Sequence, residues 1–247
     1  MKIFDFIKEN TRNYKPTEIY CYGPSTTSFE YVFPNWCEVL RYGLKTALEE
    51  YFDDYNQINW NLFVHNMGLD GAVSSELLER FNSLVLSKNP DVVFISASTN
   101  DFCYDLPLKD MRENMFKIIS ASLEAGAYTI FFTMVPSINE KHNNKYAKYL
   151  KEEIAITEEF SDNERFIFVN MFDIFPKELL EKSYTYIEEI ENPVVSIESG
   201  AIDYVHYNRY GNAVVAKIFL KEIFGVEFDH NKFLNDINDE TIKYPRF

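Results

Sequence analysis

Short apolar runs alternate with longer amphipathic segments along most of this chain, and this alternation limits the folds open to it. The runs that predict strands are apolar nearly throughout, as in parallel strands that helices cover on both faces. They are Glu18–Tyr22, Trp60–His65, Val92–Ser96, Tyr128–Met134 and Phe166–Asn170. The segments between and after them predict helices at Trp36–Phe52, Ala72–Ser87, Leu108–Ala125, Lys145–Phe160 and Tyr210–Phe224. The pattern therefore predicts an α/β fold, a three-layer αβα sandwich around a central, mostly parallel sheet of five strands.

The chain has the size of one large domain. Its 247 residues contain no internal repeat, no low-complexity tract and no linker-like break, so we expect residues 1–247 to form a single domain. Hydrophobic residues make up 46% of the chain and charged residues 26%, a mixture that excludes gross disorder. Gly126 and Gly225 each directly follow a predicted helix, so we expect them to end those helices.

The chain is strongly acidic, with 24 lysine and arginine residues against 39 aspartate and glutamate residues and a net charge of −15. Such a field repels phosphate backbones and anionic lipid surfaces, so we expect neither a nucleic-acid partner nor a membrane partner. No apolar stretch is long enough to span a bilayer, and the start of the sequence mixes acidic with apolar side chains, unlike a signal peptide. Cys21, Cys37 and Cys103 are scattered and lack the spacing of a metal or redox pair, which favours a reduced, cytoplasmic protein.

The expected architecture indicates where a ligand binds. In an open α/β sheet, ligands bind beyond the carboxyl ends of the strands, in the loops that follow them. Polar residues occupy four such loops and the segment before the last helix, at residues 23–27, 66–71, 98–101, 135–137 and 203–206. Candidate functional residues are therefore expected in these segments.

A candidate base and a candidate nucleophile lie in two of these segments. His206 follows Asp203 by three residues, so in a turn the carboxylate can hold one ring nitrogen and leave the other free as a base. Ser25 follows the first strand, where it can present its hydroxyl to a base and its N–H to a developing oxyanion. Taken alone, Asp203 and His206 also fit a surface pair without a role, and Ser25 also fits a turn or helix cap.

Two further residues are candidate donors to an oxyanion. Gly71 lies between the second strand and the next helix, where a glycine lets a ligand approach the backbone. Asn100 is placed at the end of the third strand, and its amide can stabilise charge without titrating. Taken alone, each also fits a simple turn residue. The spacing of Gly68 and Gly71 lacks the first glycine of a dinucleotide-binding fingerprint, and no G-x-x-x-x-G-K-[ST] phosphate loop occurs.

Together these residues resemble the SGNH hydrolase superfamily, the GDSL-type esterases and lipases. That family has a nucleophilic serine in a Gly-Asp-Ser block after strand one, a glycine after strand two, an asparagine in a Gly-x-Asn-Asp block after strand three and an Asp-x-x-His near the C-terminus. The residues that match these blocks in order and spacing are Ser25, Gly71, Asn100, Asp203 and His206. The resemblance covers a core of about residues 18–225, leaves a tail at 226–247, and implies a flavodoxin-like sheet.

Two positions depart from the family pattern. Pro24 stands where the family has an aspartate before the nucleophile, and Ser98 stands where its third block has a glycine. Proline fixes φ at about −65° and removes an N–H, so Pro24 can stiffen this turn in place of a hydrogen-bonded tether. Neither change removes a catalytic group, but both bear on the rate, the substrate range and the pose of Ser25.

The resemblance implies a serine esterase that needs no metal and no other cofactor. Ser25 would attack an ester carbonyl, His206 would take and return the proton, and Asp203 would orient His206. The N–H groups of Ser25 and Gly71 and the amide of Asn100 would form the oxyanion hole. The implied partner is a small-molecule acyl ester of short or medium chain length, with carbohydrate O-acetyl esters a frequent case. A carbohydrate O-acyltransferase using the same residues, and a catalytically weak binding module on the same fold, stay open as alternatives.

The remaining reactive side chains have other interpretations. His65 lies inside an apolar strand and is expected to be a hydrogen-bonded core or edge residue. His142 and His230 have polar neighbours and are expected to be solvated. Cys103 is an alternative nucleophile, which we rank below a serine with a matched base.

Aromatic side chains surround the expected mouth of the site. They can stack on a sugar, line an acyl channel or belong to the core, and they are Tyr22, Phe29, Tyr31, Phe33, Phe102, Tyr104, Tyr204 and Tyr207. Asp70 and Asp101 border the mouth but have no His or Cys partner at metal-ligand spacing. Residues 193–201 and 231–247 are candidates to cover the site or to mediate a dimer, and the oligomeric state is left open.

Overall fold

Five parallel strands form the central sheet of the computed structural model, which describes residues 3–52, 61–97, 99–184 and 202–239. Neighbouring strands are parallel throughout the order β2-β1-β3-β4-β5, which confirms the predicted fold class and is the flavodoxin-like order. The strands are β1 Thr17–Gly23, β2 Leu62–Gly68, β3 Val92–Ser96, β4 Tyr128–Phe132 and β5 Phe166–Val169. The helices and helical turns are α1 Ile3–Arg12, α2 Trp36–Phe52, α4 Ser74–Leu84, η1 Leu86–Lys88, α5 Thr99–Cys103, α6 Leu108–Glu124, α7 Glu140–Glu158, α8 Met171–Ile174, η2 Lys177–Leu179, α9 Leu180–Tyr184, α10 Arg209–Phe219, η3 Leu220–Phe224 and α11 His230–Asn238.

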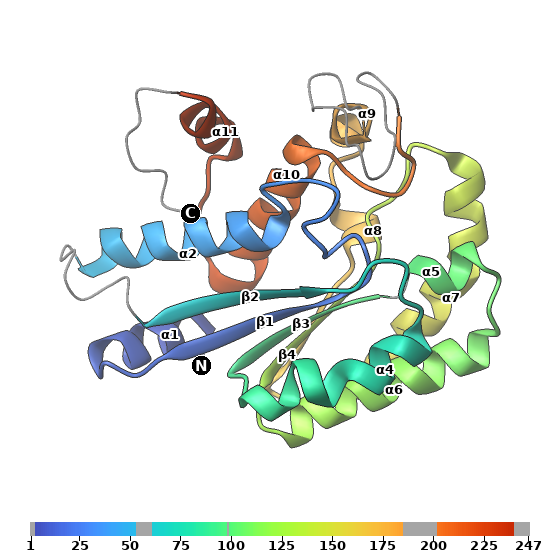
Figure 1. Ribbon diagram of the computed structural model, residues 1–247, viewed down its shortest axis with the longest axis horizontal. Helices are drawn as coiled ribbons and strands as arrows, with labels where there is room; N and C mark the ends of the chain where they lie inside the picture. The colour runs from blue at the N-terminus through green and yellow to red at the C-terminus, as the bar shows by residue number, and fades with distance from the viewer. Residues whose placement is uncertain (1–2, 53–60, 98, 185–201, 240–247) are drawn as a thin grey trace.

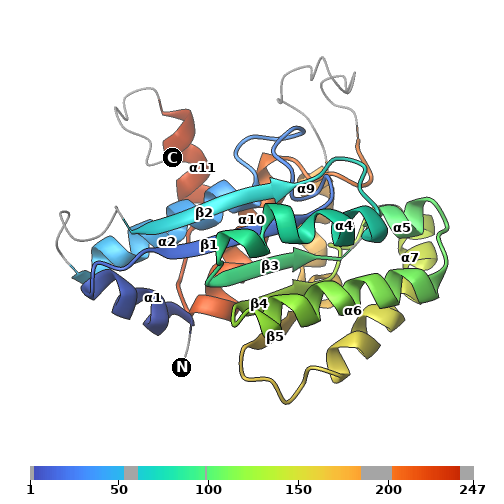
Figure 2. The same ribbon diagram turned by 60° about the horizontal axis from the view of Figure 1, so that its bottom comes forward.

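Each face of the sheet has its own apolar core, because alternate residues of a strand point to opposite faces. Val92 and Phe94 of β3 belong to the core that includes α1, α2 and α10. Val93 and Ile95 belong to the core that includes α4, α6 and α7. Figure 1 shows α2 and α10 on one side of the sheet and α4 and α6 on the other, and Figure 2 shows the strands in their order. This is the predicted three-layer arrangement.

Trp36, the first residue of α2, joins the sheet to the helices on its face. Its fully buried ring contacts Phe94 of β3, Phe132 of β4 and Phe219 of α10, with ring centroids 5.7, 5.5 and 5.1 Å apart. Aromatic rings bury large apolar areas, so this cluster fixes where α2 begins. The loop between β1 and α2 is thereby held at the carboxyl edge of the sheet.

The tail beyond Gly225 continues into a helix. α11 begins at His230, because the side chain of Asp229 accepts hydrogen bonds from the N–H groups of Asn231 and Lys232, both at 3.0 Å. Phe233 of α11 is buried against Tyr42 of α2, with ring centroids 4.9 Å apart. The described part of the tail therefore packs on the outer side of α2. Residues 193–201 and 240–247, which were considered as covers for the site, lie outside the described residues.

In the described ranges, no helix is both long enough and apolar enough to cross a bilayer. Gly126 and Gly225 have φ of +85° and +68° and end α6 and η3, which confirms their prediction as helix ends.

His230, expected to be solvated, is instead only 7% exposed, so that expectation is wrong. It faces the hydroxyl of Tyr210 at 3.4 Å, and burial lowers its pKa.

Candidate active site

The candidate site lies where the carboxyl ends of β1, β2 and β3 meet, at the edge from which the loops to α2, α4 and α5 leave (Figure 1). Gly23 at the end of β1 pairs with Gly68 at the end of β2. A side chain at Gly68 cannot be accommodated, because a Cβ there would lie 2.1 Å from the backbone nitrogen of Ser28. The glycine therefore lets the turn that carries Ser25 pass directly over the end of β2.

The turn around Ser25 is fixed by backbone hydrogen bonds. The carbonyl of Pro24 accepts from the N–H groups of Thr27 and Ser28, at 2.9 and 3.3 Å. The indole N–H of Trp36 donates to the carbonyl of Thr26 at 3.2 Å, which ties the turn to the start of α2. Ser25 is only 5% exposed. Hydrogen bonds to the carbonyls of Pro24 and Thr26 therefore hold the turn on both sides of Ser25. They do so although Pro24 stands where the family pattern has an aspartate.

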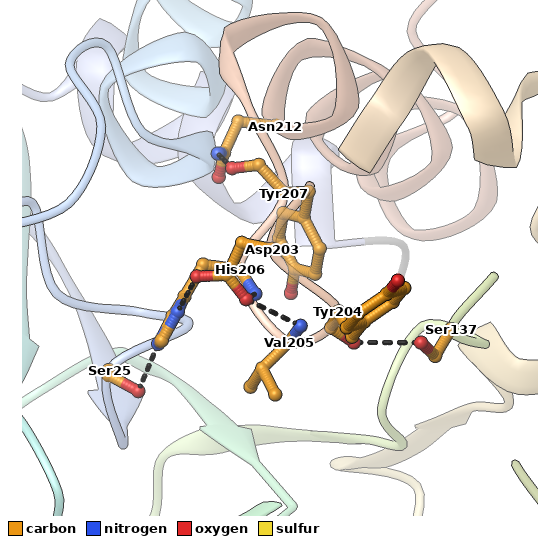
Figure 3. Close-up of polar contacts among 8 residues, drawn as sticks. All are labelled: Ser25, Ser137, Asp203, Tyr204, Val205, His206, Tyr207 and Asn212. Atoms are coloured by element: carbon orange, nitrogen blue, oxygen red, sulfur yellow. Dashed lines mark hydrogen bonds and ion pairs between the residues drawn. The ribbon is translucent and has the colours of Figure 1, made fainter. Parts of the chain in front are cut away.

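Asp203, His206 and Ser25 form a continuous chain of hydrogen bonds (Figure 3). Oδ2 of Asp203 lies 2.7 Å from Nδ1 of His206, and Nε2 of His206 lies 2.8 Å from Oγ of Ser25. Oδ1 of Asp203 accepts from the N–H groups of Val205 and His206, at 2.7 and 3.0 Å. One carboxylate oxygen therefore shapes the Asp-x-x-His turn, and the other orients the imidazole.

The charge of Asp203 is favoured by its partners. Burial opposes ionisation of this carboxyl, but the hydrogen bond and charge of His206 and the two backbone N–H groups outweigh burial and lower the pKa of Asp203. An ionised Asp203 keeps a proton on Nδ1 of His206, so Nε2 is the nitrogen that can accept a proton from Ser25. The arrangement can therefore generate a nucleophilic serine.

The candidate oxyanion donors lie in the segments that follow β2 and β3. Gly71 precedes α4 and has φ of +68°. Residues with a side chain rarely adopt this left-handed conformation, whereas glycine adopts it readily. Asn100 was expected at the end of β3, but that strand ends at Ser96 and Asn100 lies in α5. Its Nδ2 donates to the carbonyl of Ala72 at 2.9 Å, which ties the amide to the residue that follows Gly71. An amide carries two hydrogens, so a second remains for an oxyanion.

Asp101 has a structural role at the same edge. Its buried carboxylate accepts from the N–H of Ser74 at 2.8 Å and from the hydroxyl of Ser74 at 2.6 Å. It therefore caps the start of α4 from outside that helix. This contact holds α5, which carries Asn100, against the segment that follows Gly71. Ser98, the second departure from the family pattern, lies outside the described residues.

Asn212 on α10 links the two halves of the site. Its Oδ1 accepts from the backbone N–H of Trp36 at 3.1 Å, and its Nδ2 donates to the carbonyl of Tyr207 at 2.8 Å. The segment after Ser25 and the segment after His206 are therefore joined by one buried amide. The sequence does not predict that Asn212 joins these segments, because its contact with the backbone of Trp36 spans 176 positions of the chain.

Ser137, in the loop after β4, supports the turn that carries the base. Its hydroxyl donates to the carbonyl of Tyr204 at 2.7 Å (Figure 3). The side chain of Asn143 holds Ser137 in place, accepting from its N–H at 2.8 Å and donating to its carbonyl at 2.7 Å. The sequence places this loop at the ligand edge but does not predict its contact with the Asp203–His206 turn.

The aromatic side chains named from the sequence divide between core and surface. Tyr22, Phe102 and Tyr207 are buried. Exposed rings, with 43% to 64% of their surface accessible, are Phe29, Phe33, Tyr104 and Tyr204. Tyr31 is half-buried, and its ring lies parallel to the imidazole of His206, with centroids 3.9 Å apart and planes at 9°. One aromatic ring thus touches the candidate base directly.

The other reactive groups do not compete with Ser25. Burial raises the pKa of Cys103, which keeps its thiol protonated. His65 contacts Glu18 at 2.7 Å, which confirms its expected hydrogen-bonded role. His142, expected to be solvated, is half-buried beside the rings of Phe102 and Tyr204 and is therefore only partly accessible to solvent. Among the described residues, no three His, Cys, Asp or Glu side chains are grouped so as to hold a metal ion.

Comparison with known proteins identifies the family of this chain. The sequence profile of the GDSL-like lipase/acylhydrolase family matches residues 21–214. No curated protein matches the chain by sequence. Similar solved structures include a catalytic mutant of Axe2, an acetylxylan esterase from Geobacillus stearothermophilus, with a TM-score of 0.61 and 17% identity over 87% of this chain and 96% of that one.

Two further solved structures give the same result. The acetyl xylan esterase AlAXEase has a TM-score of 0.57 and 19% identity over 81% of this chain and 96% of its own. The lipase/acylhydrolase from Enterococcus faecalis has a TM-score of 0.57 and 18% identity over 85% of this chain and 96% of its own. At such low identity, these structures establish the shared fold.

Proposed function

The chain belongs to the GDSL-like lipase/acylhydrolase family and is a serine hydrolase that acts on ester bonds; we propose that it does so through Ser25, His206 and Asp203 as nucleophile, base and orienting carboxylate. The observation that carries this proposal is the chain of hydrogen bonds from Asp203 to Ser25, with contacts of 2.7 and 2.8 Å. Such a chain activates a hydroxyl that is otherwise a weak nucleophile. The family membership favours this enzyme over the binding module considered above.

Acylation follows from this arrangement. Nε2 of His206 takes the hydroxyl proton of Ser25 as Oγ attacks the ester carbonyl carbon, and the carbonyl oxygen becomes an oxyanion. The resulting imidazolium gives that proton to the departing alcohol when the ester C–O bond breaks. Asp203 stays ionised and stabilises the imidazolium throughout. The acyl group is then bound to Ser25.

Deacylation repeats these steps with water as the nucleophile. Nε2 of His206 takes a proton from water as the water oxygen adds to the acyl carbon. The bond between the acyl carbon and Oγ of Ser25 then breaks, the imidazolium returns the proton to Oγ, and the carboxylic acid leaves. The N–H groups of Ser25 and Gly71 and the amide of Asn100 would stabilise the oxyanion in both halves of the reaction. No step calls for a metal ion.

For the substrate, we propose a short- or medium-chain acyl ester, with an O-acetyl group on a carbohydrate as the leading case. Two of the similar structures are acetylxylan esterases by name. The exposed ring of Tyr204 belongs to the Asp203–His206 turn itself, and exposed aromatic rings offer flat faces on which a sugar can stack. The same residues would serve a transferase if a sugar hydroxyl replaced water.

The test is hydrolysis of p-nitrophenyl esters of increasing acyl length, alongside acetylated sugars, by the wild type and by Ser25→Ala. We expect the variant to fold normally and to lose at least about a thousandfold in kcat, because triad residues act as a unit. Ser28→Ala is the matched control: it removes a hydroxyl of the same turn, one that accepts from the N–H of Glu30. Comparable activity in Ser25→Ala and the wild type would refute the proposed nucleophile.

A further inference from the structure

The ring of Tyr31 lies face to face with the candidate base. Its centroid is 3.9 Å from that of His206, and the two planes differ by 9°. Both ring nitrogens of His206 already have hydrogen bonds, to Asp203 and to Ser25, and both bonds lie at the edge of the imidazole. These two hydrogen bonds alone allow the imidazole to tilt out of the plane that joins Asp203 to Ser25. The ring of Tyr31, which lies flat against one face of the imidazole, opposes this tilt.

Tyr31 is held in this position by its own loop. The neighbouring Val32 is buried, and the side chain of Asn35 donates to the carbonyl of Ser28 at 3.1 Å. Asn35 in turn accepts from the N–H of Cys37 at 3.1 Å, which ties this loop to the first turn of α2. The position of Tyr31 is therefore set by buried contacts on both sides of it.

From this geometry we propose that Tyr31 is a positioning residue for the base, which keeps the imidazole of His206 in the plane that joins Asp203 to Ser25 and stabilises its protonated form. This inference rests on the proposed function. A cation within about 6 Å of an aromatic centroid is attracted to the ring face. The imidazolium formed during acyl transfer satisfies that condition, whereas neutral imidazole gains less. The contact therefore strengthens as the reaction proceeds.

The tyrosine ring offers this face in its neutral form. Burial raises the pKa of Tyr31, and the nearby Asp70, Asp203, Tyr104 and Glu30 raise it further. A phenolate is therefore disfavoured across the working pH range. The groups that contact His206 include Asp203 at Nδ1 and Ser25 at Nε2, and the carboxylates of Asp70 and Glu30 act on the ring of Tyr31.

The test compares Tyr31→Phe, which keeps the flat ring, with Tyr31→Leu, which keeps apolar bulk without it. We expect Tyr31→Phe to retain kcat within about twofold and Tyr31→Leu to lose about 5- to 50-fold in kcat at nearly constant KM. The acidic limb of the pH profile of kcat should move to lower pH in Tyr31→Leu, because protonated His206 loses the contact with the ring face. Phe63→Leu removes an exposed ring near the start of β2, away from the carboxyl edge that carries the site, and should change neither quantity.

A second readout does not depend on activity. The ring-proton resonance of His206, identified by its absence in His206→Ala, should titrate at lower pH in Tyr31→Leu than in the wild type or Tyr31→Phe. This measurement tests the contact even if no ester is hydrolysed. If Tyr31→Leu does not fold, Tyr31→Met takes its place. An unchanged titration, an equal loss in Tyr31→Phe, or an effect on KM alone would each overturn the inference.

Discussion

At the scale of single residues, the site divides two tasks between the two oxygens of Asp203. Oδ1 accepts from two backbone N–H groups and shapes the turn, while Oδ2 holds the imidazole of His206. A short Asp-x-x-His segment can therefore supply both an oriented base and its own scaffold. The contacts that form the pair are local, so the spacing of Asp203 and His206 indicates that the two side chains can meet, whereas their role is indicated only together with Ser25, Gly71 and Asn100.

Asp203→Asn tests this division. The amide can keep the turn but cannot hold Nδ1 of His206 as a charged acceptor, so we expect kcat to fall by about 100- to 10,000-fold. Because the pKa of Asp203 is lowered in the folded state, its ionised form stabilises the fold at pH values above the ordinary aspartate pKa. This stabilisation is lost as the pH falls through the lowered pKa. The free energy of unfolding of the variant at neutral pH should therefore be smaller, with a weaker acid dependence. Steady-state kinetics and urea denaturation at several pH values measure the two effects.

Asn100→Ala tests the amide donor. Loss of one oxyanion donor typically lowers kcat by about 100- to 1000-fold with little change in KM, because the interaction strengthens in the transition state. Asn139→Ala is the control, since it removes an amide that caps α7 at Lys141 N and should lower stability without changing kcat. An Asn100→Ala variant with wild-type kcat would exclude Asn100 from the oxyanion hole.

Other residues of the site escape sequence reasoning for a physical reason. Asn212 acts on the backbone of Trp36 and Tyr207, and Ser137 acts on the backbone of Tyr204. Backbone donors and acceptors are the same in every residue type, so no pattern of side chains in the sequence predicts such contacts. The parallel ring of Tyr31 is similar: the sequence places it near the mouth but does not predict its contact with His206.

At the scale of elements, one buried strand and one long helix begin and end at the predicted residues. They are β3, Val92–Ser96, and α2, Trp36–Phe52. α7 begins at Glu140 rather than at Lys145, because Asn139 caps it, and an amphipathic signal is weak in its polar first turns. The short elements α5, α8 and α9 were not predicted, since a single helical turn has no periodicity to detect. α1 and α11 were also not predicted, although both bury apolar side chains.

α7 also contains a buried acid that the sequence does not mark. Glu153 is fully buried, accepts a hydrogen bond from the hydroxyl of Tyr146, and has its pKa raised to about 8 by burial. The same hydroxyl accepts from the N–H of Met134 at 3.1 Å, in the segment after β4. Glu153 is therefore a neutral acid at physiological pH that packs α7 against the sheet.

We expect the stability of the protein to fall as the pH rises from about 4.5 to about 8, by up to a few kcal/mol. The folded state keeps the proton on Glu153 in this window while the unfolded state releases it, so the unfolded state gains stability with pH. Glu153→Gln should remove most of this slope, and urea denaturation at pH values across the window measures it. Equal slopes in the variant and the wild type would show that Glu153 does not stay protonated in the folded state.

At the scale of the whole molecule, the parallel sheet assembles the site from distant parts of the chain. Ser25 and His206 are 181 positions apart, yet their side chains are 2.8 Å apart. Parallel strands place all their carboxyl ends at one edge, so loops that are remote in sequence become neighbours. The alternation of apolar and amphipathic segments predicts this edge. It does not predict which substrate the edge selects, because selection depends on the detailed positions of exposed side chains.

The central claim is that Ser25 is a nucleophile activated by His206, and covalent labelling tests it most directly. A fluorophosphonate probe phosphonylates an activated serine: a bond forms between Oγ and phosphorus while the P–F bond breaks and fluoride leaves. Intact-mass spectrometry followed by peptide mapping should find one adduct in the wild type, on Ser25, and none on Ser28. Labelling should be at least about a hundredfold slower in His206→Ala, because the serine has lost its base. An unlabelled wild-type protein, or an adduct on another residue, would contradict the account.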